Sequence, residues 1–246
     1  MAEDRLWLAI DTATDLASVA VGSPPVTQAA AFVQGARQHA AQILALVEQV
    51  LGPTRVRPKE LAGIVLGDGP GSFTGLRIGW AAAKGLAQET GLPLRTVPSL
   101  MAAAAGAARV LGDVPVAACF DALRGQVYGA VYVVKAAAVE TVVPPTLLTI
   151  DELVERSPLR PRLVVGDGAL KYAEPVRRWS GAAPVSVEEL VPPAVSMLAL
   201  LPREGAANEV PDPATAEPVY GRPAEAQAKW EARHGRPLPH PSRHGS

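Results

Sequence analysis

The first hundred residues alternate between short apolar runs and one strongly periodic segment. Short apolar runs separated by turn-forming residues are typical of strands, and they predict strands over 6–10, 18–22, 28–33 and 63–66. Between the third and fourth strands, apolar residues return at spacings of three and four from Ala40 to Leu51. That period predicts an amphipathic helix, which Gly52 and Pro53 end. Two further helices are predicted over 76–89 and 100–111.

The pattern then repeats. An apolar run over 114–120 ends at Asp121, and a short turn leads into a second apolar run over 127–134, just as the first run ends at Asp11 and a turn follows. Later segments predict a strand over 163–165, a helix over 196–201 and a loop over 208–218. We expect an N-terminal lobe over 1–112, a smaller C-terminal lobe over 113–222 and a mobile tail over 223–246.

Two α/β units that each present an aspartate after their first strand resemble the duplicated ribonuclease-H-like fold. This is the fold of actin, Hsp70 and the sugar kinases, also called the ASKHA fold. In that superfamily the two hairpins face each other across a cleft and hold nucleotide phosphates and a metal ion. Asp11, Thr12 and Asp121 are therefore the candidates for a weak, vestigial nucleotide site. The alternative is that both hairpins persist only as scaffold, since a strand-ending aspartate is often a turn residue.

A glycine-rich loop follows the fourth predicted strand, in the stretch GDGPGSFTGLRIGWAAAKGLA. A strand, a glycine loop and a helix N-terminus in this order suggest a phosphate cradle. The spacing, however, fits neither the P-loop nor the dinucleotide fingerprint. In the helix behind the loop, Gly75, Gly79 and Ala83 form a ridge of small residues. The ridge suits either close packing against a partner helix or packing against the chain's own sheet.

The composition of the chain disfavours several classes of function. The 246 residues include 48% hydrophobic and 19% charged residues, which indicates a globular protein, and the net charge of −1 disfavours autonomous nucleic-acid binding. No run of about 18 apolar residues predicts a membrane span. The single cysteine, Cys119, excludes an internal disulfide, and no signal peptide is evident. We expect a cytoplasmic protein that does not associate with membranes.

The sequence offers no catalytic or metal site. None of the four histidines is part of an H-x-x-x-H or H-E-x-x-H motif on a helix, because Pro241 interrupts the pair His240 and His244. Ser72 lies in the wrong register for a nucleophile elbow. Cys119 lies inside an apolar strand and is expected in the core.

An ordered set of motifs resembles the TsaB (YeaZ) family over most of residues 6–222. Beside the glycine-loop stretch, the set comprises LAIDTATDLASVAV, RQHAAQILALVEQVL, VPSLMAAA, FDALRGQVYGAVY, VGDGALKY and AEPVYGR. The resemblance implies a role in making N6-threonylcarbamoyladenosine at position 37 of tRNAs that read codons beginning with adenine. It implies a noncatalytic partner of the paralogue TsaD, which transfers the threonylcarbamoyl group, with the ATPase TsaE joining the assembly. Where TsaD-like proteins carry an H-x-x-x-H pair, this chain has Ser99 and Ala103.

The resemblance also implies a helix-mediated interface with TsaD. The expected contact residues lie on the first two helices and are His39, Ile43, Val47, Leu76, Gly79, Trp80 and Ala83. The same surface would form a homodimer when TsaD is absent. The chain would need no cofactor of its own, with ATP and metal held by its partners, and would meet tRNA only through the complex. The alternative is an autonomous ATP-dependent transferase or kinase of the same fold, which would need Asp11 and Asp121.

Overall fold

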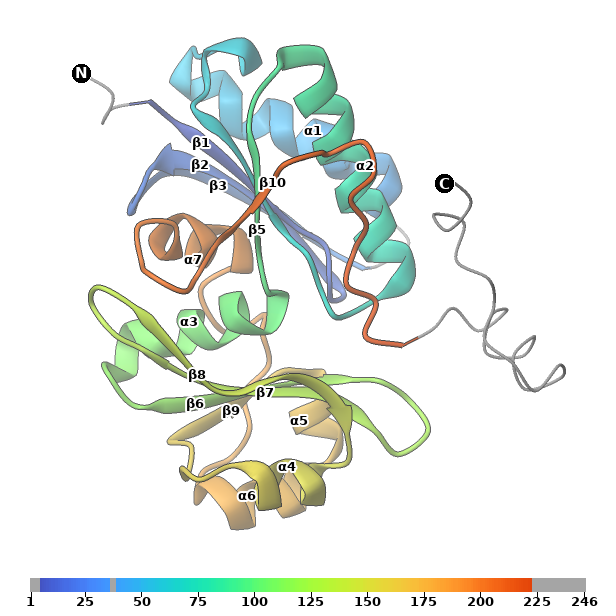
Figure 1. The fold of residues 1–246 in the computed structure, drawn as a ribbon, viewed down its shortest axis with the longest axis vertical. Coiled ribbons are helices and arrows are strands. Elements are labelled where there is room, and N and C mark those ends of the chain that lie inside the picture. Colours follow the sequence, from blue (N-terminus) through green and yellow to red (C-terminus); the bar gives the residue numbers. More distant parts are fainter. Residues whose placement is uncertain (1–4, 36–38, 223–246) are drawn as a thin grey trace, which may run out of the picture.

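The computed structural model describes residues 5–35 and 39–222, which form two sheets with helices between and outside them (Figure 1). The first sheet has six strands in the order β10-β5-β4-β1-β2-β3. Their bounds are Trp7–Asp11 (β1), Leu16–Ser23 (β2), Val26–Gln34 (β3), Gly63–Gly67 (β4), Leu94–Val97 (β5) and Asn208–Val210 (β10). The second sheet has four strands in the order β8-β7-β6-β9. Their bounds are Pro115–Asp121 (β6), Val127–Val134 (β7), Val139–Leu148 (β8) and Leu163–Val165 (β9).

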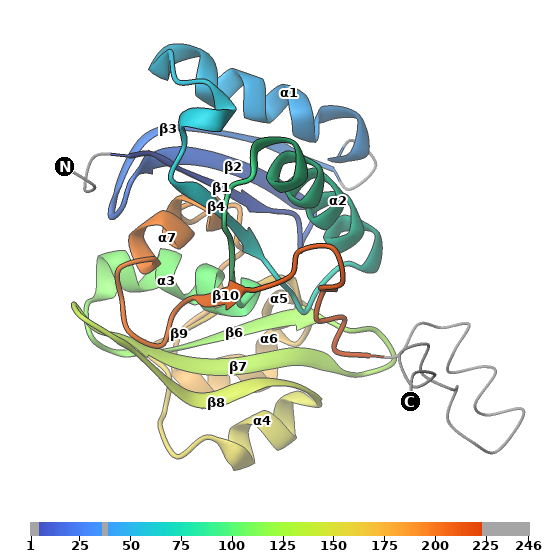
Figure 2. The same cartoon turned by 45° about the horizontal axis from the view of Figure 1, so that its top comes forward.

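The helices form three layers around these sheets (Figure 2). One pair covers the outer face of the first sheet, α1 (His39–Leu51) and α2 (Phe73–Thr90). A second pair lies between the two sheets, α3 (Ser99–Leu111) and α7 (Pro193–Leu200). Three short helices cover the outer face of the second sheet, α4 (Ile150–Arg156), α5 (Asp167–Lys171) and α6 (Ala173–Ser180). Two single 3-10 turns, Gly52–Thr54 and Pro58–Glu60, connect α1 to β4.

The two sheets repeat one topology. β1 pairs antiparallel with β2 and parallel with β4, and β6 likewise pairs antiparallel with β7 and parallel with β9. A third antiparallel strand and then a helix, α1 or α4, precede the parallel strand in each unit. Both β1 and β6 are central strands that helices cover on two faces, which explains their continuous apolar runs. The predicted duplication is confirmed.

Most predicted elements lie within a few residues of their expected positions, but β5 was not predicted. Two further differences have physical causes. β8 was not predicted because Pro144 and Pro145 interrupt it, and the structure tolerates them on an edge strand where the register with β7 shifts. The expected loop over 208–218 is wrong at its start, because residues 208–210 pair with β5. The short helices α4 to α6 were also not predicted. The division into lobes at residue 112 stays a prediction, and β10 joins the first sheet from within the range expected for the second lobe.

Candidate functional site

The glycine loop packs directly onto the turn that follows β1. A Cβ atom built on Gly67 would overlap the Asp11 carboxylate, and one built on Gly71 would overlap the carbonyl oxygen of Ala13. On α2, a Cβ on Gly75 would overlap the carbonyl oxygen of Thr12. The glycines are therefore needed for close approach between two segments of this chain, and they leave no open cradle between the segments.

Hydrogen bonds join the same two segments. The Ser72 amide donates to the carbonyl oxygen of Ala13 at 2.7 Å, and the Thr12 hydroxyl donates to the carbonyl oxygen of Gly75, also at 2.7 Å. The Gly75 amide donates to the Ser72 hydroxyl, which caps α2. Amide groups at a helix N-terminus bind phosphate when they point at open space. The Ser72 and Gly75 amides are instead bonded within the chain.

Asp11 lies at the bottom of this contact. Its side chain is 1% exposed. One carboxylate oxygen accepts a 2.8 Å hydrogen bond from the Ser99 hydroxyl, and the other accepts from the Ala13 amide at 3.2 Å. Burial raises the pKa of Asp11 to about 6, and these hydrogen bonds oppose the rise. Asp11 is thus a structural carboxylate that is enclosed by its own chain.

The sequence interpretation missed a second carboxylate in this region. Asp68 comes directly after β4, and Asp11 is the last residue of β1. Burial raises the pKa of Asp68 to about 6, with a hydrogen bond from Thr96 lowering it and the charge of Asp11 raising it further. The signal was available, since the two aspartates stand at the carboxyl ends of neighbouring parallel strands. Nearby, the Tyr132 hydroxyl is buried without a hydrogen-bond partner among the described residues, and the pKa of Tyr132 is raised by burial and by Asp68.

Asp121 lies in a separate environment on the second sheet. Its carboxylate accepts from the Leu123 amide at 3.0 Å and pairs with the Lys171 ammonium at 2.8 Å, while its amide donates to the Asp167 carboxylate at 3.0 Å. A small cleft of about 130 Å³ separates this turn from the β1–β2 turn. Its lining residues are Ala13, Thr14, Asp15, Gly71, Ser72, Phe120, Asp121 and Asp167. The two hairpins do face each other, but Asp11 does not line the cleft.

A nucleotide does not fit this arrangement. Small-molecule pockets usually enclose about 300–1,000 Å³, and the cleft between the hairpins has about 130 Å³. The Thr12 hydroxyl and the Ser72 amide, which a phosphate would need, are bonded to Gly75 and Ala13. The residues of this cleft therefore do not fit a nucleotide or a nucleotide-bound metal. Within 5–35 and 39–222, no group of three or more histidine, cysteine, aspartate or glutamate side chains is placed to hold a metal ion.

The residues expected at a partner interface are mostly part of the chain's own core. Five side chains are no more than 4% exposed in the described structure, those of Ile43, Val47, Leu76, Trp80 and Ala83. Gly79 is also buried, and a Cβ on it would overlap the Thr12 hydroxyl oxygen. His39 is the first residue of α1, and its side chain lies outside the described part of the chain. The small-residue ridge of α2 therefore packs against the chain's own β1–β2 turn.

The outward face of the same two helices carries a different set of residues. On α2, Ala81 and Gly85 are exposed, and Gly85 has open space where a Cβ would be. On α1, Leu44 is 56% exposed and lies next to the exposed Ala45. Periodicity alone does not distinguish these residues from the inward ridge, because both sets recur at helical spacing.

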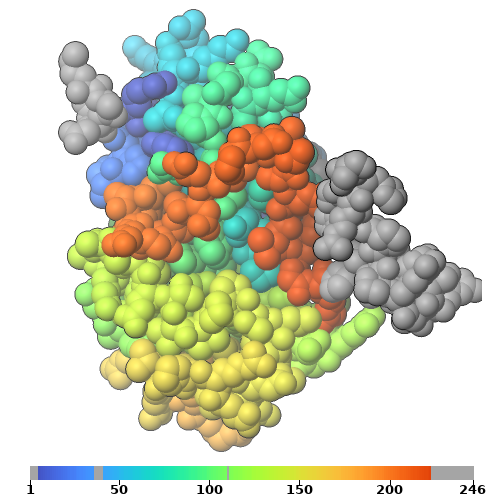
Figure 3. All heavy atoms as spheres, in the orientation of Figure 1, coloured from blue at the N-terminus to red at the C-terminus, as the bar shows by residue number. Residues whose placement is uncertain are grey.

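The C-terminal part of the described chain crosses from one unit to the other. The segment that ends at residue 222 runs over the surface of the first unit and reaches the second (Figure 3). The Val219 amide donates to the carbonyl oxygen of Asp68 at 2.8 Å, and Arg222 donates to the Gln126 side chain at 2.8 Å. This segment therefore holds the glycine loop from outside. The tail over 223–246, which was predicted to be mobile, lies outside the described residues.

The chain is similar to known proteins in sequence and in fold. A family model described as TsaD, tRNA N6-adenosine threonylcarbamoyltransferase, matches residues 33–176. The Bacillus subtilis tRNA threonylcarbamoyladenosine biosynthesis protein TsaB is 31% identical over 91% of this chain and 96% of its own length. The Escherichia coli TsaB is 42% identical over 51% of this chain and 54% of its own length. A crystal structure of YeaZ from Pseudomonas aeruginosa superposes with a TM-score of 0.71 at 26% identity, covering 88% of this chain and 99% of that one.

The fold and the comparisons together show to which fold class the chain belongs. The two repeated units are those of the duplicated ribonuclease-H-like (ASKHA) fold, so the predicted fold class is confirmed. Within that class, the chain belongs to the TsaB (YeaZ) family. Among its described residues, no helix is long and apolar enough to cross a membrane.

Proposed function

We propose that this chain is a noncatalytic partner of TsaD in the synthesis of N6-threonylcarbamoyladenosine in tRNA. The names of its relatives support a role in this biosynthetic pathway. The packing of the glycine loop supports the noncatalytic role, because Gly67, Gly71 and Gly75 lie directly against Asp11, Ala13 and Thr12 and leave no room between the two segments. In this proposal the chain supports transfer of the threonylcarbamoyl group to adenosine 37, while its partners hold ATP and metal.

The outward face of α1 and α2 is the proposed surface for TsaD. Its exposed residues include Leu44, Ala45, Ala81 and Gly85, which are small or apolar. Small residues let helix backbones approach closely, so a partner helix pair can pack there with little rearrangement. The same face would join two copies of this chain when TsaD is absent. TsaE would join the resulting assembly in the cytoplasm, and tRNA would be met only through it.

Reconstitution of tRNA modification tests the proposal. TsaD, TsaE, the threonylcarbamoyl donor and tRNA are combined with and without this chain, and modified adenosine is quantified by mass spectrometry. We expect modification to require the chain, and to be retained at no less than about half the wild-type rate with Asp121→Asn, because no chemistry is assigned to that carboxylate. Full modification without the chain would contradict the proposal. ATP hydrolysis by the purified chain that Asp121→Asn abolishes would support the autonomous ATP-dependent transferase or kinase instead.

A further inference from the structure

The first sheet ends on one side in β3, whose outer edge is open. Within the described ranges β3 pairs only with β2, and it is the last strand of its sheet. In an antiparallel sheet, every second residue of an edge strand points its backbone amide and carbonyl groups away from its neighbour. Such unpaired groups bind another extended strand, so natural proteins protect their edges by charged side chains, proline, bulges, short length or a covering segment.

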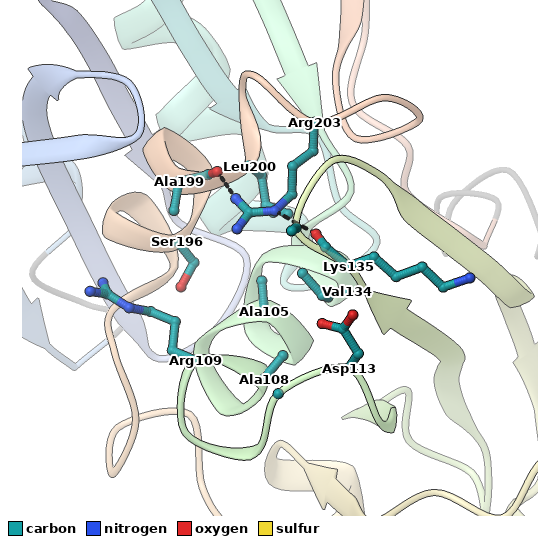
Figure 4. A pocket seen from close by; sticks show the side chains of 12 residues that line it. Ala105, Ala108, Arg109, Asp113, Val134, Lys135, Ser196, Ala199, Leu200 and Arg203 are labelled. Atoms are coloured by element: carbon teal, nitrogen blue, oxygen red, sulfur yellow. Dashed lines mark hydrogen bonds between the residues drawn. The ribbon is translucent and has the colours of Figure 1, made fainter.

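The other three edges of the two described sheets are protected. β9 and β10 are short, with three residues each. β8 is interrupted by the prolines at 144–145, where its register with β7 shifts. At the start of β8 the Val139 amide donates to the carbonyl oxygen of Glu204 at 2.8 Å, and the neighbouring Arg203 guanidinium bonds to the carbonyl oxygen of Lys135 (Figure 4). That segment therefore covers the beginning of the β8 edge.

β3 lacks most of these protections. Its register with β2 shifts at Gln28, but the six residues that follow, Ala29–Gln34, pair regularly with residues 16–21. These six residues include no charged side chain and no proline. The same run carries Phe32, whose side chain is 60% exposed although it is large and apolar. An uncharged edge with an exposed phenyl ring is a surface that suits another strand.

We propose that this edge pairs with β3 of a second copy of the chain, antiparallel and about a two-fold axis at Phe32. The two phenyl rings then lie directly opposite each other, and Ala30 of each copy faces Gln34 of the other. The axis falls on a residue because side chains alternate between the faces of a strand, so that exposed positions meet exposed positions. With Phe32 on the axis, the paired residues 30–34 exclude the register shift at Gln28.

Charge and symmetry favour a second copy over a different chain. In a two-fold pairing, side chains near the axis lie close to the same residues of the other copy, so a charged edge would repel itself. The run Ala29–Gln34 is neutral, and self-pairing therefore meets no like-charge repulsion within it. The edge shares no residue with the surface on α1 and α2 proposed for TsaD, so this inference does not depend on that role.

Multi-angle light scattering of the full chain tests this pairing in a Gly85→Arg background, which blocks the surface proposed on α2. We expect this variant to be dimeric at about 100 µM and to dissociate on dilution with a micromolar dissociation constant. Adding Phe32→Lys puts two like charges on the axis and should raise the dissociation constant at least about tenfold. The matched Val26→Lys, at a position that is 62% exposed and lies before the register shift, should leave it within about twofold.

Disulfide formation in the same background locates the axis. Phe32→Cys should crosslink two copies under mild oxidation, because opposite residues of antiparallel strands have Cα atoms about 4.5–5.5 Å apart and a disulfide spans about 4.4–6.8 Å. Val26→Cys should not crosslink, since its two copies would lie about 40 Å apart along the strands. The native Cys119 is buried and does not compete. A monomeric Gly85→Arg variant, equal dissociation constants for Phe32→Lys and Val26→Lys, or equally fast crosslinking of the two cysteine variants would overturn the proposal.

Discussion

The hydroxyl of Thr12 donates a 2.7 Å hydrogen bond to the backbone carbonyl of Gly75, tying the β1–β2 turn to the first turn of α2. Thr12 is completely buried, and the backbone of this turn occupies the space that a Cβ on Gly75 would need. In an open nucleotide site these two segments would border a phosphate. Here they are in direct contact, so the glycine loop functions in packing.

The contact predicts opposite effects for two glycines of one helix. Gly75→Ala should lower the free energy of unfolding by about 1–3 kcal/mol, because its Cβ would overlap backbone that has no room to move. Gly85→Ala should raise it by about 1 kcal/mol, since a Cβ there meets open space and alanine favours the helix. Urea denaturation followed by circular dichroism measures both changes. If the two variants were equally stable, the close packing at Thr12 would be disproved.

The buried carboxylates predict a decline in stability with rising pH. The pKa of Asp11 and that of Asp68 are each raised from 3.8 to about 6 in the folded chain. The folded state therefore binds more protons than the unfolded state between these values, and the free energy of unfolding should fall as pH rises from about 4 to about 6. Asp11→Asn should remove part of this fall, leaving the variant up to about 2 kcal/mol more stable than wild type at pH 7.5.

A matched control accompanies this pH series. Glu155 is exposed on α4, so Glu155→Gln should follow the wild-type curve at every pH. At pH 4 both variants should match wild type, because Asp11 is then protonated in the folded chain. An Asp11→Asn variant that is less stable than wild type at pH 7.5 would mean that the ionised carboxylate is stabilising, contrary to this account.

Sequence patterns predicted the longer helices α1, α2 and α3 and the central strands β1, β4 and β6 well, but they did not show what one face of α2 packs against. α1 was predicted from its apolar period, and β1, β4 and β6 from continuous apolar runs. The ridge of Gly75 and Gly79 was equally compatible with a partner or with the chain's own turn, because spacing along a helix does not state what lies opposite. That opposite surface is Thr12, more than sixty positions earlier.

The β6–β7 turn predicts a stabilising substitution. Leu123 has a φ of 61°, in the left-handed region, and its side chain is 63% exposed. The left-handed conformation costs a residue such as leucine about 1–2 kcal/mol, and asparagine adopts it with less strain. Leu123→Asn should therefore raise the free energy of unfolding by about 1 kcal/mol. Thermal denaturation checks this, and an unchanged or lower midpoint would show that Leu123 makes contacts that offset the strain.

The burial of Cys119 predicts that its thiol does not react while the chain is folded. It is fully buried on β6, and burial raises the pKa of its thiol to about 12. Because the thiolate is the reactive form, an aromatic disulfide reagent at pH 7.5 should label Cys119 only after unfolding in denaturant. Stoichiometric labelling of the native chain within minutes would place the thiol in an accessible environment and contradict the packing of the second sheet.

The most direct test of the central claim is TsaD association with Gly85→Arg, measured by multi-angle light scattering. Gly85 is exposed on the outward face of α2, so arginine there should preserve the fold while blocking close helix packing. The control, Leu159→Arg, introduces the same charge at an exposed position after α4. We predict that the control associates like wild type and that Gly85→Arg does not. Wild-type association of a folded Gly85→Arg variant would contradict the proposed interface.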